Sequence, residues 1–501
     1  MDSHTDRTLR GVNYNFLNTA GKTILHFVVG IILARLILPA DFGLLGMAYI
    51  FIGLANLFST LGMGSAVIQK SNLNNEHIRI AATLSLLLSL LIYVSFWLFS
   101  PLISDFFNEP RVTPIVRVIS MLFIFQGLYS ISHGLVARKM DFKSIFIIET
   151  IAFAVGQGVV SIILAFLDYG VWSLVFGRVI TGILLFVMFI IKARLPVKPL
   201  LKKKEAYELF SFGSGVSLIG ILNYAATNVD YLIIGKFLSP LSLGLYTRAY
   251  NLMGLPLSQI SATISGVLFS AYSEIQDQTE KLRRSYLKAI NFIGLAAFPI
   301  LAGMIACSYY IIVGLYGKNW EGAVEVFILL SVSAFFKVIY QITGAVTKAT
   351  GNVYREVWRQ FVYLIILAGG VLIGVRFGIE GVGFVVILAS IWLYISLARL
   401  VTKIINSPIK AFFKAQLPGL VVAVIVFLTD QAAIFLLNAV SPSLNDTIML
   451  MVLVIVSLAA LLLCYIYLPE RIIGEMPKWI FNKYKKYIPF KLARKQTKLA
   501  V

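Results

Sequence analysis

The chain is short of charge, cysteine and histidine, and each shortage excludes a class of protein. Only 13% of its 501 residues are charged, whereas 59% are hydrophobic. A soluble domain is about 25% charged and about 45–50% apolar. The two cysteines, Cys307 and Cys464, lie in apolar runs and exclude a disulfide-based fold. The composition therefore places the chain in a lipid bilayer.

The sequence also lacks the signatures of enzyme sites. It has no glycine-rich phosphate loop after a strand and no His/Cys cluster with metal-binding spacing. Its four histidines are scattered along the chain. No loop on the outer side is long enough to fold into a domain. We therefore expect no catalytic residue, no metal and no cofactor, and we expect any substrate to be handled among the helices.

Long apolar runs are what the chain has in place of these features. A membrane-spanning helix needs about 20 apolar residues, and the runs between charged or Pro/Gly breaks predict fourteen such spans. The predicted class is an all-α membrane protein with two six-helix lobes and two extra helices. The predicted parts are a lobe over 1–192, a basic connector over 193–208, a lobe over 209–403, two added spans within 404–468 and a basic tail over 469–501.

Positive charge is concentrated on one side of the predicted spans. The formal net charge is +20, and most Lys and Arg residues fall in alternate loops on the same side as the N-terminus. Because such loops face the cytoplasm, we expect both termini inside. The surplus charge suits attraction to anionic membrane lipids, and it calls for no nucleic acid.

Two stretches 201 positions apart carry the same spacing of a cation, a proline and a glycine. Each has a cation, a proline four residues later and a glycine four residues after that: Arg35, Pro39 and Gly43, then Lys236, Pro240 and Gly244. A repeat of this length in a membrane chain is typical of transporters built from two homologous helix bundles. Six spans separate the copies, so the two bundles share one orientation. The two cations of the repeat lie near span ends and are expected to mark the outer headgroups.

Polar residues line one face of the first predicted span. Asn15, Asn18, Lys22 and His26 are spaced by three or four residues, which places them on one side of a helix. A lysine at the depth of Lys22 is costly if it faces lipid, so we expect it to face a wet cavity. The repeat sets this face against the corresponding line in the seventh span, formed by Asn223, Thr227 and Asp230.

Further polar residues in later spans extend the predicted cavity. Asn251 and Gln259 share a face of the eighth span with Arg248, while Arg178 and Lys337 lie in the sixth and tenth spans. Cations outnumber acids inside the spans, which favours an anionic substrate such as a phosphate or diphosphate.

Structural roles remain open for several of these groups. Lys22 or Arg248 could pair with an acid and only hold helices together. Asp230 could neutralise a cation or carry a coupling ion. His26 could be a packed histidine or a proton relay.

Four segments of the chain resemble one known family. They are Asn13–Leu17, Ile32–Leu44, Gly62–Gln69 and Ala137–Lys143. All four are similar to segments of the polysaccharide exporters of the O-antigen and colanic-acid type, within the multidrug/oligosaccharidyl-lipid/polysaccharide exporter superfamily. The resemblance covers almost the whole chain, including the expected number of spans.

This resemblance implies a flippase rather than an enzyme. Its substrate would be an undecaprenyl-diphosphate-linked glycan, moved across the cytoplasmic membrane by alternating access of two lobes, and polysaccharide assembly proteins would be possible partners. The candidates for a cationic binding site, taken from their placement in the spans, are Lys22, Arg178, Arg248 and Lys337. A multidrug or cation antiporter of the same superfamily is the alternative, and a membrane polysaccharide polymerase is a weaker one.

Overall fold

The protein is all-helical in the computed structural model, which describes residues 21–60, 67, 73–196, 199–200, 224–441 and 444–469. Helices occupy most of these ranges and no strand occurs in them, so the predicted fold class is confirmed. Asn15, Asn18 and Asn223 lie outside the described residues, and the side chain of Gln259 is not described either.

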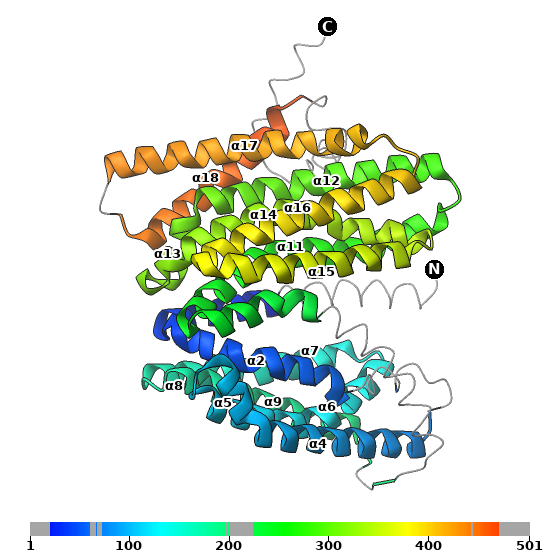
Figure 1. The fold of residues 1–501 in the computed structure, drawn as a ribbon, viewed down its shortest axis with the longest axis vertical. Helices are drawn as coiled ribbons and strands as arrows, with labels where there is room; N and C mark the ends of the chain where they lie inside the picture. The colour runs from blue at the N-terminus through cyan, green and yellow to red at the C-terminus, as the bar shows by residue number, and fades with distance from the viewer. Residues whose placement is uncertain are drawn as a thin grey trace. The chain divides into compact units, whose positions relative to one another are not determined.

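The colours in Figure 1 show the order of the helices along the chain. Residues 21–36 and 224–237 are helical and precede the two copies of the repeat. The helices of the first half are α2 (Pro39–Thr60), α4 (Asn75–Phe107), α5 (Val112–Ser120), α6 (Leu122–Arg138), α7 (Phe142–Phe153), η1 (Ala154–Val160), α8 (Ser161–Phe166) and α9 (Val171–Ala193). Those that follow are α11 (Pro240–Glu274), α12 (Thr279–Ala306), α13 (Ser308–Tyr316), η2 (Lys318–Ala323), α14 (Val324–Ala349), α15 (Val353–Gly374), η3 (Val375–Phe377), α16 (Gly378–Ile404), α17 (Ile409–Val440) and α18 (Asp446–Tyr467).

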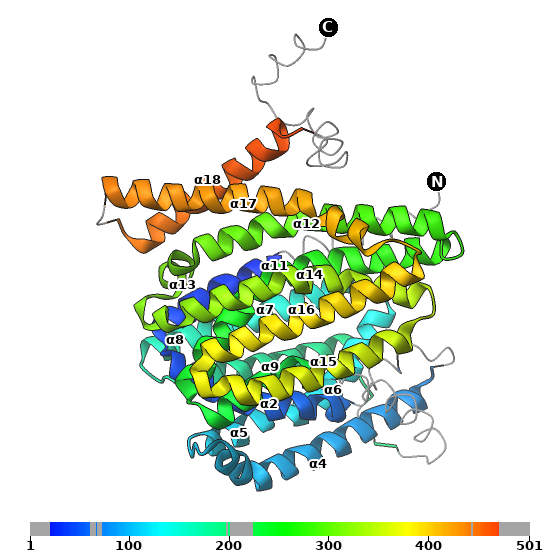
Figure 2. The same ribbon diagram turned by 45° about the horizontal axis from the view of Figure 1, so that its top comes forward.

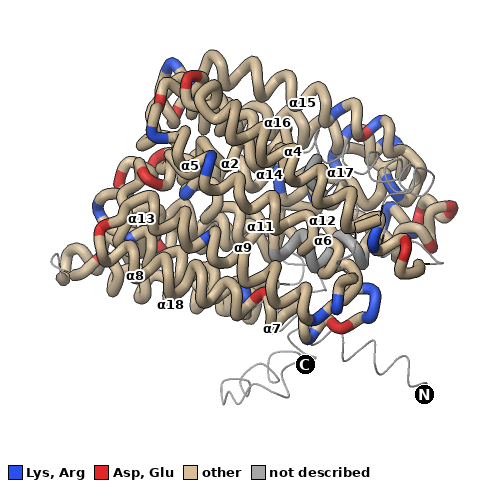
Figure 3. The backbone as a smooth tube through the Cα atoms, turned by 90° about the horizontal axis from the view of Figure 1, so that it is seen from below, with Lys and Arg blue, Asp and Glu red and all other residues tan. Residues whose placement is uncertain are grey.

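Most of these helices are long and apolar enough to cross a bilayer. In the part of the chain that the structure describes, ten helical stretches meet that condition by length and composition. Figure 3 shows long helices without charge over most of their length and with Lys, Arg, Asp and Glu mainly toward their ends. This distribution of charge fits membrane-spanning helices, which have an apolar middle and polar ends. The number fourteen stays a prediction.

The chain divides into two compact units. The first contains residues 1–248, 315–323 and 367–382, and the second contains 249–314, 324–366 and 383–501. The predicted lobe boundaries at 192 and 209 stay predictions. Both candidate arginines, Arg178 and Arg248, fall in the first unit.

Glycines set the helix spacing inside the first unit. A β-carbon on Gly127 of α6 would lie 2.8 Å from the Ser85 carbonyl oxygen of α4, and one on Gly156 would lie 2.6 Å from the Thr181 nitrogen of α9. The helices α4, α6 and α9 accordingly run side by side in both Figure 1 and Figure 2. Small residues allow this close backbone approach, which drives helix association in a bilayer.

The sequence repeat is also a structural repeat. The helix before each copy ends three residues ahead of the proline, and α2 and α11 begin at the equivalent residues Pro39 and Pro240. Proline suits the first position of a helix because the amide hydrogen it lacks would have no partner there. The two copies therefore form the same helix–break–helix corner.

The two corners contact each other through their glycines. A β-carbon on Gly43 would clash with the Pro240 carbonyl oxygen and lie 3.0 Å from the Gly244 nitrogen. In return, a β-carbon on Gly244 would clash with the Pro39 carbonyl oxygen and lie 3.1 Å from the Gly43 nitrogen. The contact is reciprocal, as expected when equivalent surfaces of a repeat pack on each other.

Further hydrogen bonds hold the repeat helices in place within the first unit. The Tyr224 hydroxyl lies 3.1 Å from the carbonyl oxygen of Tyr49 and 2.9 Å from that of Ile50, both in α2. The buried indole of Trp320 donates to the Ala34 carbonyl at 2.7 Å. Because Ala34 lies in the last turn of its helix, this bond satisfies a carbonyl that the helix itself leaves open.

Close helix packing also builds the second unit. A β-carbon on Gly419 of α17 would lie 2.5 Å from the Gly294 carbonyl carbon of α12. Farther along α17, the Ser457 hydroxyl of α18 lies 2.8 Å from an Asp430 carboxyl oxygen. The two added C-terminal helices are thus attached to the unit through α12.

The corner contact predicts that two glycine substitutions differ greatly in their effect on the free energy of unfolding. Gly43→Ala forces the α2 and α11 backbones apart, and we expect it to lower the free energy of unfolding by at least about 3 kcal/mol, the upper end for overpacking. The measurement is unfolding of the purified protein in mixed micelles, followed by circular dichroism.

Gly254→Ala is the matched control, because Gly254 lies in α11, the helix that Gly43 of α2 contacts, but a β-carbon there meets no atom within 4 Å. Alanine has the higher helix propensity, so this variant should be as stable as the parent or slightly more so. Equal stability of the Gly43→Ala and Gly254→Ala variants would contradict the corner contact.

Candidate functional site

A cavity of about 400 Å³ in the first unit brings two predicted cations together. We call it the arginine cavity. The helix 21–36, α2, η1, α9 and the start of α11 all contribute to its wall. Its polar and aromatic lining consists of His26, Phe42, Tyr49, Phe153, Gln157, Arg178 and Arg248. Among the described residues that line it, no side chain is acidic.

Aromatic rings hold both arginines in place. The Arg248 guanidinium carbon lies 3.9 Å from the Phe42 ring centroid, and that of Arg178 lies 5.8 Å from the Tyr49 ring centroid. A ring face attracts a cation without neutralising it. Neither arginine forms an ion pair with an acid within the described ranges. Their positive charges therefore remain available to an anion.

His26 and Gln157 add neutral polar groups to the same wall. The His26 ring stacks on Phe153, with centroids 3.6 Å apart and planes 14° apart. Gln157 lies in the π-helical segment η1, between Gly156 and Gly158. Such segments occur mostly as local bulges and often mark functional sites. The structure thus places His26 in the cavity, and it adds Gln157, which sequence analysis missed.

Lys22 has an acidic partner. Its ammonium forms an ion pair with the Glu149 carboxylate of α7 and lies 5.4 Å from the Phe146 ring centroid. The same carboxylate lies 3.7 Å from the imidazole of His133. Pairing was the structural alternative for Lys22, and this geometry favours it. A role of Lys22 in binding substrate stays a prediction.

The candidate polar residues of the helix 224–237 form hydrogen bonds with nearby residues. Asp230, which is 4% exposed, accepts a bond of 2.8 Å from the Tyr246 hydroxyl of α11 and one of 2.9 Å from the Tyr231 amide. The Thr227 hydroxyl donates to the Tyr224 carbonyl at 3.1 Å. Asp230 thus joins its helix to α11, which favours the structural alternative, while ion coupling stays a prediction.

The remaining candidates belong to the second unit. Lys337 is 6% exposed, and its ammonium lies 4.8 Å from the Tyr250 ring centroid. Asn251 is exposed on α11. Their part in a substrate site stays a prediction, as does that of Gln259.

Two buried acids in the second unit escaped sequence analysis. Asp430 of α17 accepts from Ser457 and from the Cys307 thiol, and Glu356 of α15 accepts from Thr347 and Gln360. Asp430 lies inside a long apolar run, where an acid is costly unless it is satisfied, and that cost is a sequence signal that could have singled it out. Glu356 lies in the first turn of α15 beside Arg355, where the sequence gives no such signal.

The arginine cavity can bind an anion without a metal ion. Two guanidinium groups offer several forked donors, the geometry that suits phosphate oxygens. The described residues contain no group of three or more His, Cys, Asp or Glu side chains placed to hold a metal.

Comparison of the sequence with known proteins points to polysaccharide assembly. Residues 32–325 match the polysaccharide biosynthesis protein family. The lipopolysaccharide biosynthesis protein WzxC of Escherichia coli K12 is 26% identical over 74% of this chain and 76% of its own length. The succinoglycan biosynthesis transport protein ExoT of Rhizobium meliloti is 21% identical over 65% of each chain.

The fold is similar to that of solved membrane transporters. A lipid II flippase, MurJ, in an inward closed conformation superimposes with a TM-score of 0.72 at 18% identity, covering 94% of this chain and 99% of its own. A multidrug resistance transporter of the MATE family in an inward-facing conformation gives a TM-score of 0.60 at 18% identity, covering 78% of this chain and 95% of its own.

The Lys22–Glu149 pair predicts energetic coupling between two helices. Each single change, Lys22→Ala or Glu149→Ala, leaves a partly buried charge without its partner and should destabilise the protein. The double variant should be more stable than the sum of the single effects implies, by about 1–2 kcal/mol. The measurement is a double-mutant cycle on unfolding in mixed micelles.

The exposed pair Arg284–Glu280 provides the control for this cycle, because solvent screens it. Its coupling should be close to zero and smaller than that of Lys22–Glu149. If the Lys22–Glu149 coupling is no larger than that of the control, the pair does not hold helix 21–36 to α7.

Proposed function

Because the chain belongs to the polysaccharide biosynthesis protein family, we propose that it is a flippase for lipid-diphosphate-linked glycans. The observation that carries this proposal is the arginine cavity, where Arg178 and Arg248 face one space of about 400 Å³ with no acid among its described lining residues. A diphosphate diester is a dianion, and two guanidinium groups match it in charge and in donor geometry.

The names of the relatives support the same substrate class. They include a lipopolysaccharide biosynthesis protein and a succinoglycan transport protein. The substrate proposed here is an undecaprenyl-diphosphate-linked repeat unit. It would cross the cytoplasmic membrane, with both termini of the protein on the cytoplasmic side, by alternating access of lobes over 1–192 and 209–403.

The alternative functions fit the cavity less well. An antiporter for cationic drugs would need an acidic lining to attract them, and the described lining carries two arginines instead. An enzyme such as a polymerase would need an acid or a nucleophile at the site, and apart from the His26 imidazole the lining offers aliphatic chains, aromatic rings, one amide and two guanidinium groups. The lining of the cavity therefore suits a large anionic substrate better than a cationic drug.

Substitution of either arginine should abolish most of the transport. Arg178→Ala or Arg248→Ala removes charge-assisted hydrogen bonds to the diphosphate, and each should slow translocation about tenfold or more. The measurement uses proteoliposomes that contain a fluorescent polyprenyl diphosphate disaccharide. Dithionite quenching from outside reports the fraction that has changed leaflet.

Arg376→Ala is the matched control, because Arg376 is an exposed cation of the same unit outside the cavity. Its translocation rate should equal that of the parent. Unchanged rates in both cavity variants, with the proteins correctly folded, would refute the proposed role of the cavity.

A further inference from the structure

A second pocket opens beside the arginine cavity in the first unit. It has a volume of about 260 Å³ and lies between α2, α6 and α9. We call it the side pocket. It shares Tyr49 and Arg178 with the arginine cavity, so a ligand bound at Arg178 reaches both spaces. Its remaining polar and aromatic lining includes Asn56, Phe123, Gln126 and Tyr129.

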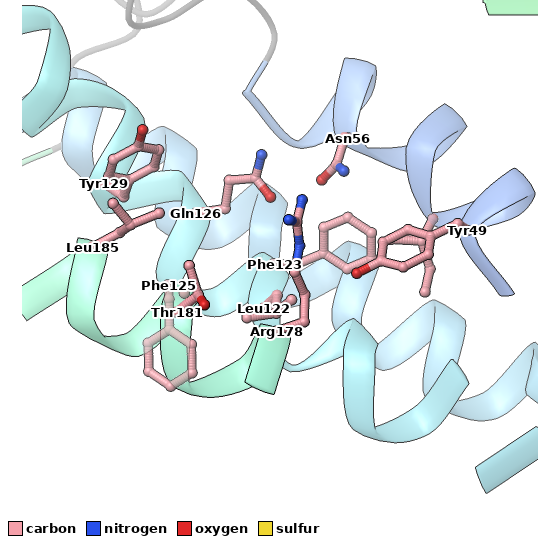
Figure 4. Close-up of a pocket in the computed structure, with 12 residues that line it drawn as sticks. Tyr49, Asn56, Leu122, Phe123, Phe125, Gln126, Tyr129, Arg178, Thr181 and Leu185 are labelled. Carbon is pink, nitrogen blue, oxygen red and sulfur yellow. The ribbon is translucent and has the colours of Figure 1, made fainter. Parts of the chain in front are cut away.

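The side pocket combines ring faces with side-chain amides. Figure 4 shows the amide groups of Gln126 and Asn56 reaching toward the Arg178 guanidinium, with the rings of Tyr49 and Phe123 beside them. Gln126 forms no hydrogen bond with the described residues, and neither does the Tyr129 hydroxyl. A neutral amide offers two donors and an acceptor, so this wall has unused capacity for a ligand rich in hydroxyl groups.

The walls of the side pocket are held rigidly. Gly127 next to Gln126 packs on α4, with a β-carbon position 2.8 Å from the Ser85 carbonyl oxygen. The Thr181 hydroxyl on the opposite wall donates to the Gly177 carbonyl at 2.8 Å. The Tyr129 ring packs edge-on against Phe189, with centroids 5.2 Å apart. Close packing around an open space indicates a preformed site, because interiors otherwise leave few voids.

A sugar ring fits this combination of groups. A pyranose presents an apolar face of C–H bonds, which suits an aromatic ring, and a rim of hydroxyl groups, which suits amides. The volume is near the lower end for ligand pockets, roughly 300–1,000 Å³, so the side pocket holds one ring rather than a whole repeat unit. No acidic side chain is among its described lining residues, which disfavours a positively charged amino sugar.

We propose that the side pocket binds the first sugar of the substrate, an uncharged or acidic pyranose, while the diphosphate lies at Arg178 and Arg248. This inference rests on the proposed function. The first sugar is bonded directly to the diphosphate, so its subsite has to adjoin the phosphate-binding cation. The side pocket meets that requirement through Arg178.

The test compares binding of two kinds of probe to the full-length protein in nanodiscs. One is a fluorescent polyprenyl diphosphate without sugar, and the other is the same lipid carrying glucose, N-acetylglucosamine or glucuronic acid. Gln126→Ala and Tyr129→Phe should weaken binding of at least one sugar-bearing probe by about five- to tenfold, because each removes a hydrogen bond. Both should leave binding of the sugar-free probe unchanged.

Matched controls and the Arg178→Ala variant separate a failure of the proposed flippase function from a failure of the sugar subsite. Gln276→Ala and Tyr354→Phe change exposed residues outside the site and should bind every probe as the parent does. Arg178→Ala should weaken both kinds of probe. If it weakens neither, or the parent protein binds no probe, the proposed function fails and the subsite with it.

The remaining outcomes bear on the subsite alone. If Arg178→Ala weakens both kinds of probe but the Gln126 and Tyr129 variants weaken neither, the side pocket is not a sugar subsite. Equal weakening of both kinds of probe by the Gln126 and Tyr129 variants also overturns the inference. So does a parent protein that binds no sugar-bearing probe more tightly than the sugar-free one.

Discussion

The reciprocal contact of Gly43 with Gly244 is the constraint on which the rest of the first unit depends. Two helix starts from the two copies of the repeat approach until backbone atoms touch. Gly43 follows Phe42, and Gly244 lies one turn before Arg248, so the same contact places the Arg248 guanidinium 3.9 Å from the Phe42 ring centroid. A residue from the second copy of the repeat thereby becomes part of a cavity built mainly by the first copy.

The three cations Lys22, Arg178 and Arg248 have two different kinds of partner. Lys22 meets a carboxylate, Glu149, and its charge is compensated within the protein. Arg178 and Arg248 meet aromatic rings, which lower the cost of removing a cation from water but leave its charge uncompensated. A charge paired inside the protein has little left for a ligand, whereas a charge supported by a ring still attracts one. This difference separates the acid-paired Lys22 from the two arginines of the cavity.

Sequence analysis could predict the features that depend on local pattern. The repeat predicted equivalent helix starts, which the structure places at Pro39 and Pro240. The excess of cations within the spans singled out Arg178 and Arg248, which line one cavity and whose role in binding stays a prediction. It could not predict that Glu149, 127 residues from Lys22, would be the partner of that lysine, because no local period records a long-range pair. Nor did it predict that η1 would place Gln157 in the cavity, since a π-helical turn depends on the packing around Gly156 and Gly158.

The charges that remain explain why, in the proposed flippase, a diphosphate would be a better ligand for this cavity than a single carboxylate. With Lys22 paired to Glu149, the described lining carries the two positive charges of Arg178 and Arg248. A diphosphate diester would bring two negative charges and make the loaded cavity neutral, whereas a carboxylate would leave one guanidinium without a counter-ion. Since an unpaired charge inside a membrane costs several kcal/mol, charge matching would favour the dianion before any sugar is recognised. The amides and rings of the proposed sugar subsite would then discriminate among glycans without disturbing that balance.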